Sequence, residues 1–199
     1  MCQLLGMNCA TPTDFNFSFR GFARRGGATD KHEHGWGLAI YEGPGLRTFH
    51  DPQPAADSAI AHFVEGYPIK TLNMISHIRY ATMGKVALEN VHPFQREMWG
   101  INWAFAHNGD VPKFSNKPYN EYPLLGRLTN RDQNFYHPVG DTDSEAGKCV
   151  IVGWQILNTL GGSYCTPSYR TSYLHAWNAI FARPYFIRIH HKLQFSAQY

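Results

Sequence analysis

The sequence predicts an α+β protein in which short strands and short helices follow one another within one domain. A length of 199 residues is enough for one sizeable core and too short for two comfortable domains. Hydrophobic residues make up 43% of the chain and charged residues 17%, as is typical of packed globular proteins. Strands separated by short helices, without obvious parallel connections, favour α+β over a doubly wound sheet.

The first part of the chain alternates between predicted strands and a helix. Residues 2–7 form an apolar run that ends before a Thr-Pro turn, which predicts a buried strand. The aromatic segment 15–25 predicts a short helix followed by a loop. Residues 35–41 and 46–50 predict a hairpin around a turn at residues 42–45.

Four further elements follow from periodicity and capping signals. Apolar residues at helical spacing predict a helix over residues 54–66. Residues 71–80 alternate between apolar and polar, which predicts a half-buried strand, and residues 100–107 predict another strand ending on a turn. A helix is expected from Ser144 onward, with Asp143 as a candidate N-cap.

Composition excludes several classes of protein. No apolar run approaches the roughly 18–20 residues that span a bilayer, and no basic region precedes the first apolar stretch. We therefore expect no membrane association and a cytoplasmic location. The net charge of +3 gives no support for nucleic-acid binding. The cysteines match no metal-binding or disulfide pattern and are expected to be reduced thiols: Cys2, Cys9, Cys149 and Cys165.

The acidic residues are distributed unevenly along the chain. All 15 lie at or before Glu145, and the segment from Ala146 to Tyr199 carries five basic residues and no acid. The composition therefore changes near residue 146.

Cys2 is the first candidate for chemistry. Removal of Met1 would leave a cysteine with a free α-amine, whose pKa of about 7.7–8.0 leaves part of it neutral at pH 7. Such an amine can accept the thiol proton, so that one residue supplies both nucleophile and base. Alone, a cysteine near a terminus is more simply a small buried apolar residue.

Three other segments carry suitable polar groups. Arg79 follows a predicted strand, and its planar guanidinium matches a substrate carboxylate, although a surface ion pair is the simpler reading. Asn108 and Gly109 offer a side-chain amide and an accessible backbone N–H, as an oxyanion hole requires, or form an ordinary turn. Residues 140–145 gather three carboxylates that could bind an ammonium group or a metal, or cap a helix.

Together, these segments resemble the class II glutamine amidotransferases of the stand-alone type. The similarity covers roughly residues 1–150, in the order and spacing of the family. It rests on the following motifs: residues 1–6 (MCQLLG), 35–37 (GWG), 77–82 (HIRYAT), 89–94 (ENVHPF), 107–109 (HNG) and 140–145 (GDTDSE).

The resemblance implies a role for each matching residue. Cys2 would be the nucleophile and its α-amine the base, with Asn108 and Gly109 as the oxyanion hole. The substrate-binding residues would be Arg79 for the α-carboxylate, Asp143 for the α-ammonium group, and Thr82 and His92 beside the pocket. The implied reaction hydrolyses the γ-amide of glutamine to glutamate and ammonia.

The resemblance also implies an architecture and partners. The family fold is the four-layer αββα sandwich of the N-terminal-nucleophile hydrolases. The expected substrate is a small molecule, with no metal and no other cofactor. An amidotransferase of this kind also requires a separate partner subunit that accepts the ammonia.

Two features depart from the family pattern. His34 stands where relatives tend to carry an acid. The match fades after Glu145, so we expect residues 1–150 to form the amidotransferase domain and residues 151–199 an atypical tail that is not a separate domain. An altered reading frame would explain such a tail, and the sandwich would then be incomplete or altered at its C-terminal end.

Three alternatives remain open from the sequence. A hydrolase of a larger γ-glutamyl amide, such as a γ-glutamyl peptide or thiol conjugate, would use the same glutamyl-binding residues. A metal-binding protein could use the histidines, although none has the spacing of a known zinc site. A non-catalytic relic of the family would keep the motifs and lose function through its tail.

Overall fold

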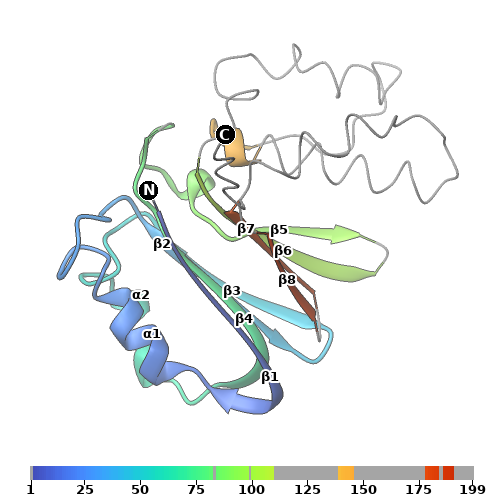
Figure 1. Cartoon of the computed structure of the whole chain (residues 1–199). Helices are drawn as coiled ribbons and strands as arrows, with labels where there is room; N and C mark the ends of the chain where they lie inside the picture. The colour runs from blue at the N-terminus through green and yellow to red at the C-terminus, as the bar shows by residue number, and fades with distance from the viewer. Residues whose placement is uncertain are drawn as a thin grey trace, which may run out of the picture.

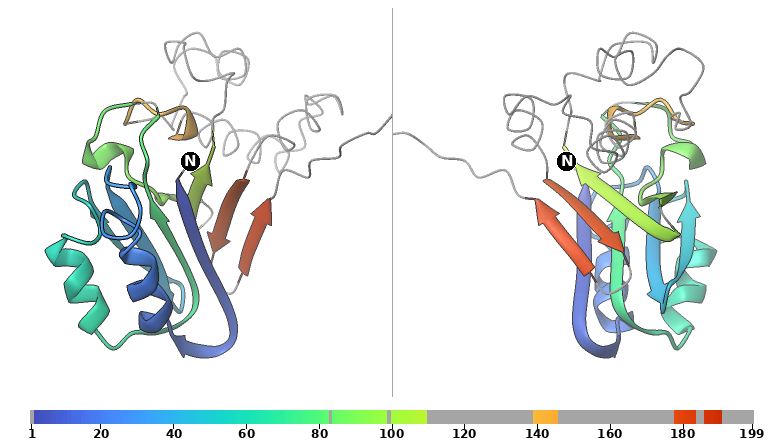
Figure 2. Two further views of the ribbon diagram at one scale, coloured as in Figure 1. Left: turned by 60° about the vertical axis from the view of Figure 1, so that its left-hand side comes forward. Right: turned by 90° about the vertical axis from the view of Figure 1, so that its right-hand side faces the viewer.

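The architecture consists of two antiparallel sheets packed face to face, with two helices on the outer face of the first sheet. It is seen in a computed structural model (Figure 1) that describes residues 2–82, 84–98, 100–109, 139–145, 178–183 and 186–190. The second sheet lies on the opposite side of the first sheet from the helices (Figure 2). The predicted α+β class is confirmed, and the predicted fourth, helical layer falls outside the described residues.

Each sheet has four strands in the described part of the chain. The first sheet has the spatial order β1 (Gln3–Asp14), β4 (Lys70–Ile78), β2 (Trp36–Glu42) and β3 (Gly45–Asp51). The second has the order β5 (Phe94–Met98), β6 (Ile101–Asn108), β7 (Asn178–Arg183) and β8 (Phe186–His190). The helices are α1 (Asn16–Ala23), α2 (Ala59–Gly66) and a 3-10 turn, η1 (Leu88–Asn90).

Strand β2 is buried on both faces because it is central in the first sheet and covered by a layer on each side. Successive side chains of a strand point to opposite faces. Leu38 and Ile40 therefore join the helices in one core, while Ala39 and Tyr41 join the second sheet in another. This arrangement explains why β2 reads as an almost continuous apolar run.

Tyr41 links the two sheets through its hydroxyl group. The hydroxyl donates to the carbonyl of Asn102 at 3.1 Å and accepts from the backbone N–H of Ala104 at 3.1 Å. Burial raises the pKa of Tyr41 far above its ordinary value, so the hydroxyl keeps its proton and remains a donor.

Most predicted elements are confirmed, with differences at their ends. Strand β1 continues to Asp14, beyond the predicted Thr-Pro turn, because it pairs again with β4 after an irregularity between Asn8 and Thr13. Helix α2 starts at Ala59, later than predicted, because the Ser58 side chain accepts from a backbone N–H as its N-cap.

Three local predictions about strands were wrong or incomplete. Strand β1 is not buried: its residues are half-buried or exposed, because it lies at the edge of the first sheet. Strand β4 is not half-buried, because Ile75 contributes to the core between the sheets while Met74 faces the helices. Strand β5 was not predicted, since its polar residues show no clear alternation, and its pairing with β6 places it in the sheet.

The described part of the C-terminal segment belongs to the second sheet. Strand β7 pairs with β6, and β8 pairs with β7, both antiparallel. In the predicted atypical tail, which comprises residues 151–199, all residues other than those of β7 and β8 lie outside the described residues. Within the described residues, no helix is both long and apolar enough to cross a membrane.

Gly37 packs closely against the segment that precedes β5. A Cβ at this position would overlap the carbonyl oxygen of His92 and press on the ring of His50. We expect Gly37→Ala to lower the free energy of unfolding by about 1–3 kcal/mol, measured by urea denaturation. Gly21→Ala is the matched control, because a Cβ there meets no atom within 4 Å on α1.

The control should stabilise the protein by about 0.5–1 kcal/mol, as alanine does in an exposed helix. Equal stability of Gly37→Ala and the wild type would contradict this close packing.

Candidate active site

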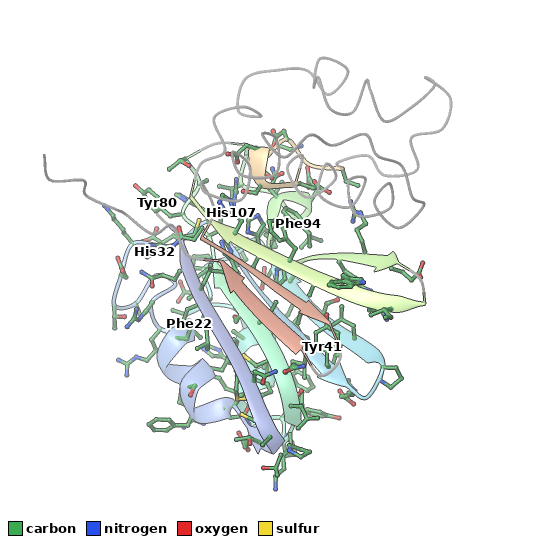
Figure 3. The ribbon with its side chains drawn as sticks, turned by 45° about the vertical axis from the view of Figure 1, so that its right-hand side comes forward. Phe22, His32, Tyr41, Tyr80, Phe94 and His107 are labelled. Carbon is green, nitrogen blue, oxygen red and sulfur yellow. The ribbon has the colours of Figure 1, made fainter. Side chains whose placement is uncertain are left out.

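A pocket opens at the end of the sandwich where β1 begins and where β4 and β6 end. It is half open to solvent, and its empty space of about 320 Å³ includes part of that solvent. Figure 3 shows Tyr80 and His107 close together at this end, with Tyr41 further along the sheets. The pocket is lined by Cys2, His77, Arg79, Tyr80, Ala81, Thr82, His92, His107, Gly109, Thr142, Asp143 and Ser144.

The thiol of Cys2 is held by the backbone that follows β4. The N–H of Tyr80 donates to Sγ at 3.3 Å, and Sγ lies 3.5 Å from the carbonyl of Tyr80, which accepts from the thiol. This two-point contact fixes the sulfur at the pocket although the residues are far apart in sequence.

His34 supports the same segment from the other side. Its Nδ1 accepts from the backbone N–H of Ala81 at 2.8 Å, so Nδ1 carries no proton in this arrangement. The ring also packs on Tyr80, with centroids 5.2 Å apart. A carboxylate oxygen could accept the same bond, so the acid expected at this position would serve the same role.

Arg79 is 4% exposed and is held by a loop that follows it. Its Nη1 donates to the carbonyl of Lys85 at 2.9 Å, and its Nη2 to the carbonyl of Gly84 at 3.3 Å. Burial lowers the pKa of the guanidinium, and attraction to Cys2 and Asp141 opposes that shift. A buried guanidinium beside the thiol provides a localised positive charge at the pocket.

The three carboxylates of residues 140–145 have separate surroundings. Asp141 is bonded to the amide of Asn90, and Glu145 forms an ion pair with Arg96 at 3.0 Å. Asp143 alone lines the pocket, where it is 5% exposed. A single buried carboxylate in the pocket suits an ammonium group better than a metal ion, which usually requires several ligands.

The predicted cap of the helix start at residue 143 was wrong by one residue. The hydroxyl of Thr142 accepts from the backbone N–H of Glu145 at 3.3 Å, so Thr142 is the N-cap. Asp143 is the first helical residue, and its side chain lines the pocket instead of capping the helix.

Three buried histidines lie side by side at the inner wall of the pocket. The rings of His77 and His92 are 4.3 Å apart, and Nδ1 of His92 accepts from the backbone N–H of His107 at 3.3 Å. Nδ1 of His107 lies 2.9 Å from the hydroxyl of Ser144, which is 3.4 Å from Asp143. These contacts connect the end of β6 to the segment that carries Asp143.

Burial lowers the pKa of His77 from 6.5 to about 3, with repulsion from His107 as the next cause. Between these values the unfolded chain binds a proton that the folded protein does not. The contribution of His77 to the free energy of unfolding is therefore fully present above pH 6.5 and is lost as the pH falls toward 3.

We expect the free energy of unfolding to fall more steeply with decreasing pH in the wild type than in His77→Asn, by up to about 1.4 kcal/mol per pH unit. Urea denaturation of both proteins at several pH values between 7 and 4 measures the two slopes. Parallel slopes would show that His77 titrates normally in the folded protein.

The structure brings together six of the seven predicted site residues. Around the one pocket it places Cys2, Arg79, Thr82, His92, Gly109 and Asp143. Asn108 is adjacent in the chain but does not line the pocket, and its side-chain oxygen is buried without a hydrogen bond. Among the described residues, no group of three or more His, Cys, Asp or Glu side chains could hold a metal ion.

Several lining residues were not predicted individually. Tyr80, His77 and His107 lie within the motifs that the sequence singled out. The sequence therefore indicated that they lie near the site, but it did not indicate their roles. Asn90 and Asp141 do not line the pocket but hold the residues that do, and a local pattern carries no signal for such long-range partners.

Comparison with known families identifies this arrangement. The family model for class-II glutamine amidotransferases matches residues 1–179. The chain belongs to this family. The matched range extends past residue 150, where the motif resemblance ends, and reaches into strand β7.

Relatives of this class II amidotransferase chain occur in bacteria. It is 52% identical over 151 residues to a "Putative glutamine amidotransferase" of Haemophilus influenzae, covering 76% of this chain and 47% of the relative. It is 50% identical over 152 residues to a "Putative glutamine amidotransferase YafJ" of Escherichia coli, covering 76% and 54%. The chain thus spans about half the length of these curated relatives.

Solved structures support the same fold. A crystal structure named "predicted glutamine amidotransferase from Pseudomonas aeruginosa" has a TM-score of 0.55 and 33% identity, over 91% of this chain and 69% of that one. An "allosteric regulatory enzyme of purine biosynthesis" has a TM-score of 0.58 and 18% identity, over 92% and 36%. This second likeness is one of fold alone.

Proposed function

We propose that this class II amidotransferase chain hydrolyses the γ-amide of glutamine with Cys2, after removal of Met1, as its nucleophile. One observation carries the proposal. Cys2, Arg79, Gly109 and Asp143 come from distant parts of the sequence and line one pocket. The binding and hydrolysis of an amino-acid amide require these groups: a thiol, a buried cation, a backbone donor and a buried carboxylate.

The glutamyl end of the substrate would be bound by charge. Arg79 would hold the α-carboxylate, because a guanidinium can donate two parallel hydrogen bonds to it. Asp143 would accept from the α-ammonium group. Thr82 and His92 lie beside these groups, and both line the pocket.

The chemistry would proceed in two stages. The neutral α-amine of Cys2 takes the thiol proton, and the sulfur attacks the γ-carbonyl carbon of glutamine. The backbone N–H of Gly109 would stabilise the negative oxygen of the tetrahedral intermediate by a hydrogen bond. The side-chain amide of Asn108, which does not line the pocket, would have to turn toward it to donate a second one. The C–N bond then breaks, the amine returns its proton to the leaving nitrogen, and ammonia and a thioester form. Water attacks the thioester to release glutamate and the free thiol.

The ammonia requires an acceptor, which we propose to be a partner subunit or a part of the longer relatives that this chain does not match. The contacts described here recognise only the glutamyl end of a substrate. A larger γ-glutamyl amide would satisfy them equally, so the experiment must separate the two substrates.

The glutamine analogue 6-diazo-5-oxo-norleucine tests the nucleophile. Protein that begins at Cys2 is incubated with the analogue, and the adduct is located by peptide mass spectrometry. Cys2→Ala is the control, with circular dichroism to verify its fold. We expect labelling at Cys2 alone and release of glutamate from glutamine.

Each other outcome has a distinct meaning. Labelling at Cys2 without glutamine turnover would indicate a larger γ-glutamyl amide as the substrate or the need for a missing partner subunit. No labelling of folded protein that begins at Cys2 would overturn the catalytic proposal.

A further inference from the structure

Asn90 lies outside the pocket but is completely buried, and its side-chain amide is fully hydrogen-bonded. Its Oδ1 accepts from the backbone N–H of Asp141 at 3.0 Å. Its Nδ2 donates to the carbonyl of Lys85 at 3.0 Å and to the carboxylate of Asp141 at 2.5 Å. A buried amide with every group satisfied fixes the position of its partners, because loss of any bond leaves a buried polar group unpaired.

The first partner of Asn90 holds Arg79. The carbonyl of Lys85 accepts from Nδ2 of Asn90 and also from Nη1 of Arg79 at 2.9 Å. The loop that retains the guanidinium is therefore anchored by Asn90. A shift of this loop would move the positive charge that faces the substrate.

The second partner of Asn90 lies two residues before Asp143. Asp141 is bonded to Asn90 through both its backbone and its side chain, and its charge attracts Arg79. Gly140 packs so closely that a Cβ there would overlap Oδ1 of Asn90. The segment that carries Asp143 is therefore docked on the same amide as the Arg79 loop.

We propose that Asn90 is a positioning residue that sets the spacing between Arg79 and Asp143, and so selects substrates with an α-carboxylate and an α-ammonium group on one carbon. This inference rests on the proposed function. The two charged groups of an amino acid have a fixed separation, so both protein groups must be placed together. A displacement of about 1 Å in such a site can reduce activity on the order of 100-fold.

The isosteric variant Asn90→Asp tests the proposal. It keeps the size of the side chain, removes both donors, and places a carboxylate against Asp141 and the carbonyl of Lys85. We expect the KM for glutamine to rise at least about tenfold and kcat to change less than about threefold, because binding and not the thiol chemistry is disturbed.

The double variant Asn90→Asp with Asp141→Asn provides a rescue. The amide introduced at position 141 can donate to the carboxylate introduced at position 90, which restores the side-chain bond in the reverse direction. One negative charge also remains near Arg79. We expect part of the rise in KM to be reversed, because the bond to position 141 is restored while the bond to the carbonyl of Lys85 is not. Asn102→Asp is the matched control: its Oδ1 accepts from Gln95 at 3.1 Å on the exposed side of β6, so KM should not change.

The outcomes are separable. If the wild type turns over glutamine and Asn90→Asp has the same KM, the inference is overturned and the proposed function stands. A loss of kcat at unchanged KM, or a double variant no better than Asn90→Asp, would show a general folding defect and also overturn it. If the wild type, beginning at Cys2, neither binds nor hydrolyses glutamine, the proposed function fails and this inference fails with it.

Discussion

A chain that keeps a residue before Cys2 is expected to hydrolyse glutamine about 10²–10⁴ times more slowly than one that begins at Cys2. An extra residue converts the α-amine into a peptide nitrogen, which has no lone pair available to accept a proton. The sulfur itself would keep its contacts with the backbone of Tyr80. The loss would therefore fall on proton transfer and not on the position of the thiol.

Two preparations of the same chain measure this effect. One carries a removable tag whose cleavage leaves Cys2 first, and the other retains one additional residue after the same treatment. Mass spectrometry verifies the two N-termini, and thermal unfolding verifies that both are folded. Equal rates of glutamate release would show that the α-amine is not the base.

Arg79→Met is expected to raise the KM for glutamine on the order of 100-fold, which corresponds to about 2.7 kcal/mol. Hydrogen bonds to charged groups contribute about 1.5–3 kcal/mol each, and a guanidinium can make two to a carboxylate. Arg79→Lys keeps the charge and loses the planar fork, so an intermediate rise in KM is expected.

Arg25→Met is the matched control for this series. Arg25 donates to the side chain of Gln3 in an exposed pair near the start of β1 and does not line the pocket. Steady-state kinetics with glutamine should therefore show no change in KM. An unchanged KM in Arg79→Met would contradict the assignment of Arg79 to the substrate carboxylate.

Much of the fold follows from local patterns. Apolar spacing, aromatic content and turn signals predicted both helices and the four strands of the first sheet, because these signals act between near neighbours in the chain. The burial of β4 on both faces could not be read in this way, since it depends on a second sheet that packs on it. Strand β5 was missed for a related reason: its place is set by its partner, β6.

The candidate site shows the same division. Cys2 at the second position, Arg79 after a strand and Asp143 at a helix start are visible as residue types in ordered motifs. The sequence also predicted that residues 140–145 would be functionally important. It did not show that Asp141 and Glu145 have partners outside the pocket while Asp143 lines it, or that Thr142 and not Asp143 caps the helix.

By itself, then, the sequence determined the family, the α+β class and the chemical groups available for catalysis. Only the tertiary structure decided which backbone atoms hold the sulfur of Cys2, that His34 accepts from Ala81, and that Asn90 joins the Arg79 loop to Asp141. The physical reason is the range of the interactions. Periodicity and capping act between near neighbours, whereas most of these hydrogen bonds join segments that are far apart in the sequence and meet only in the folded chain.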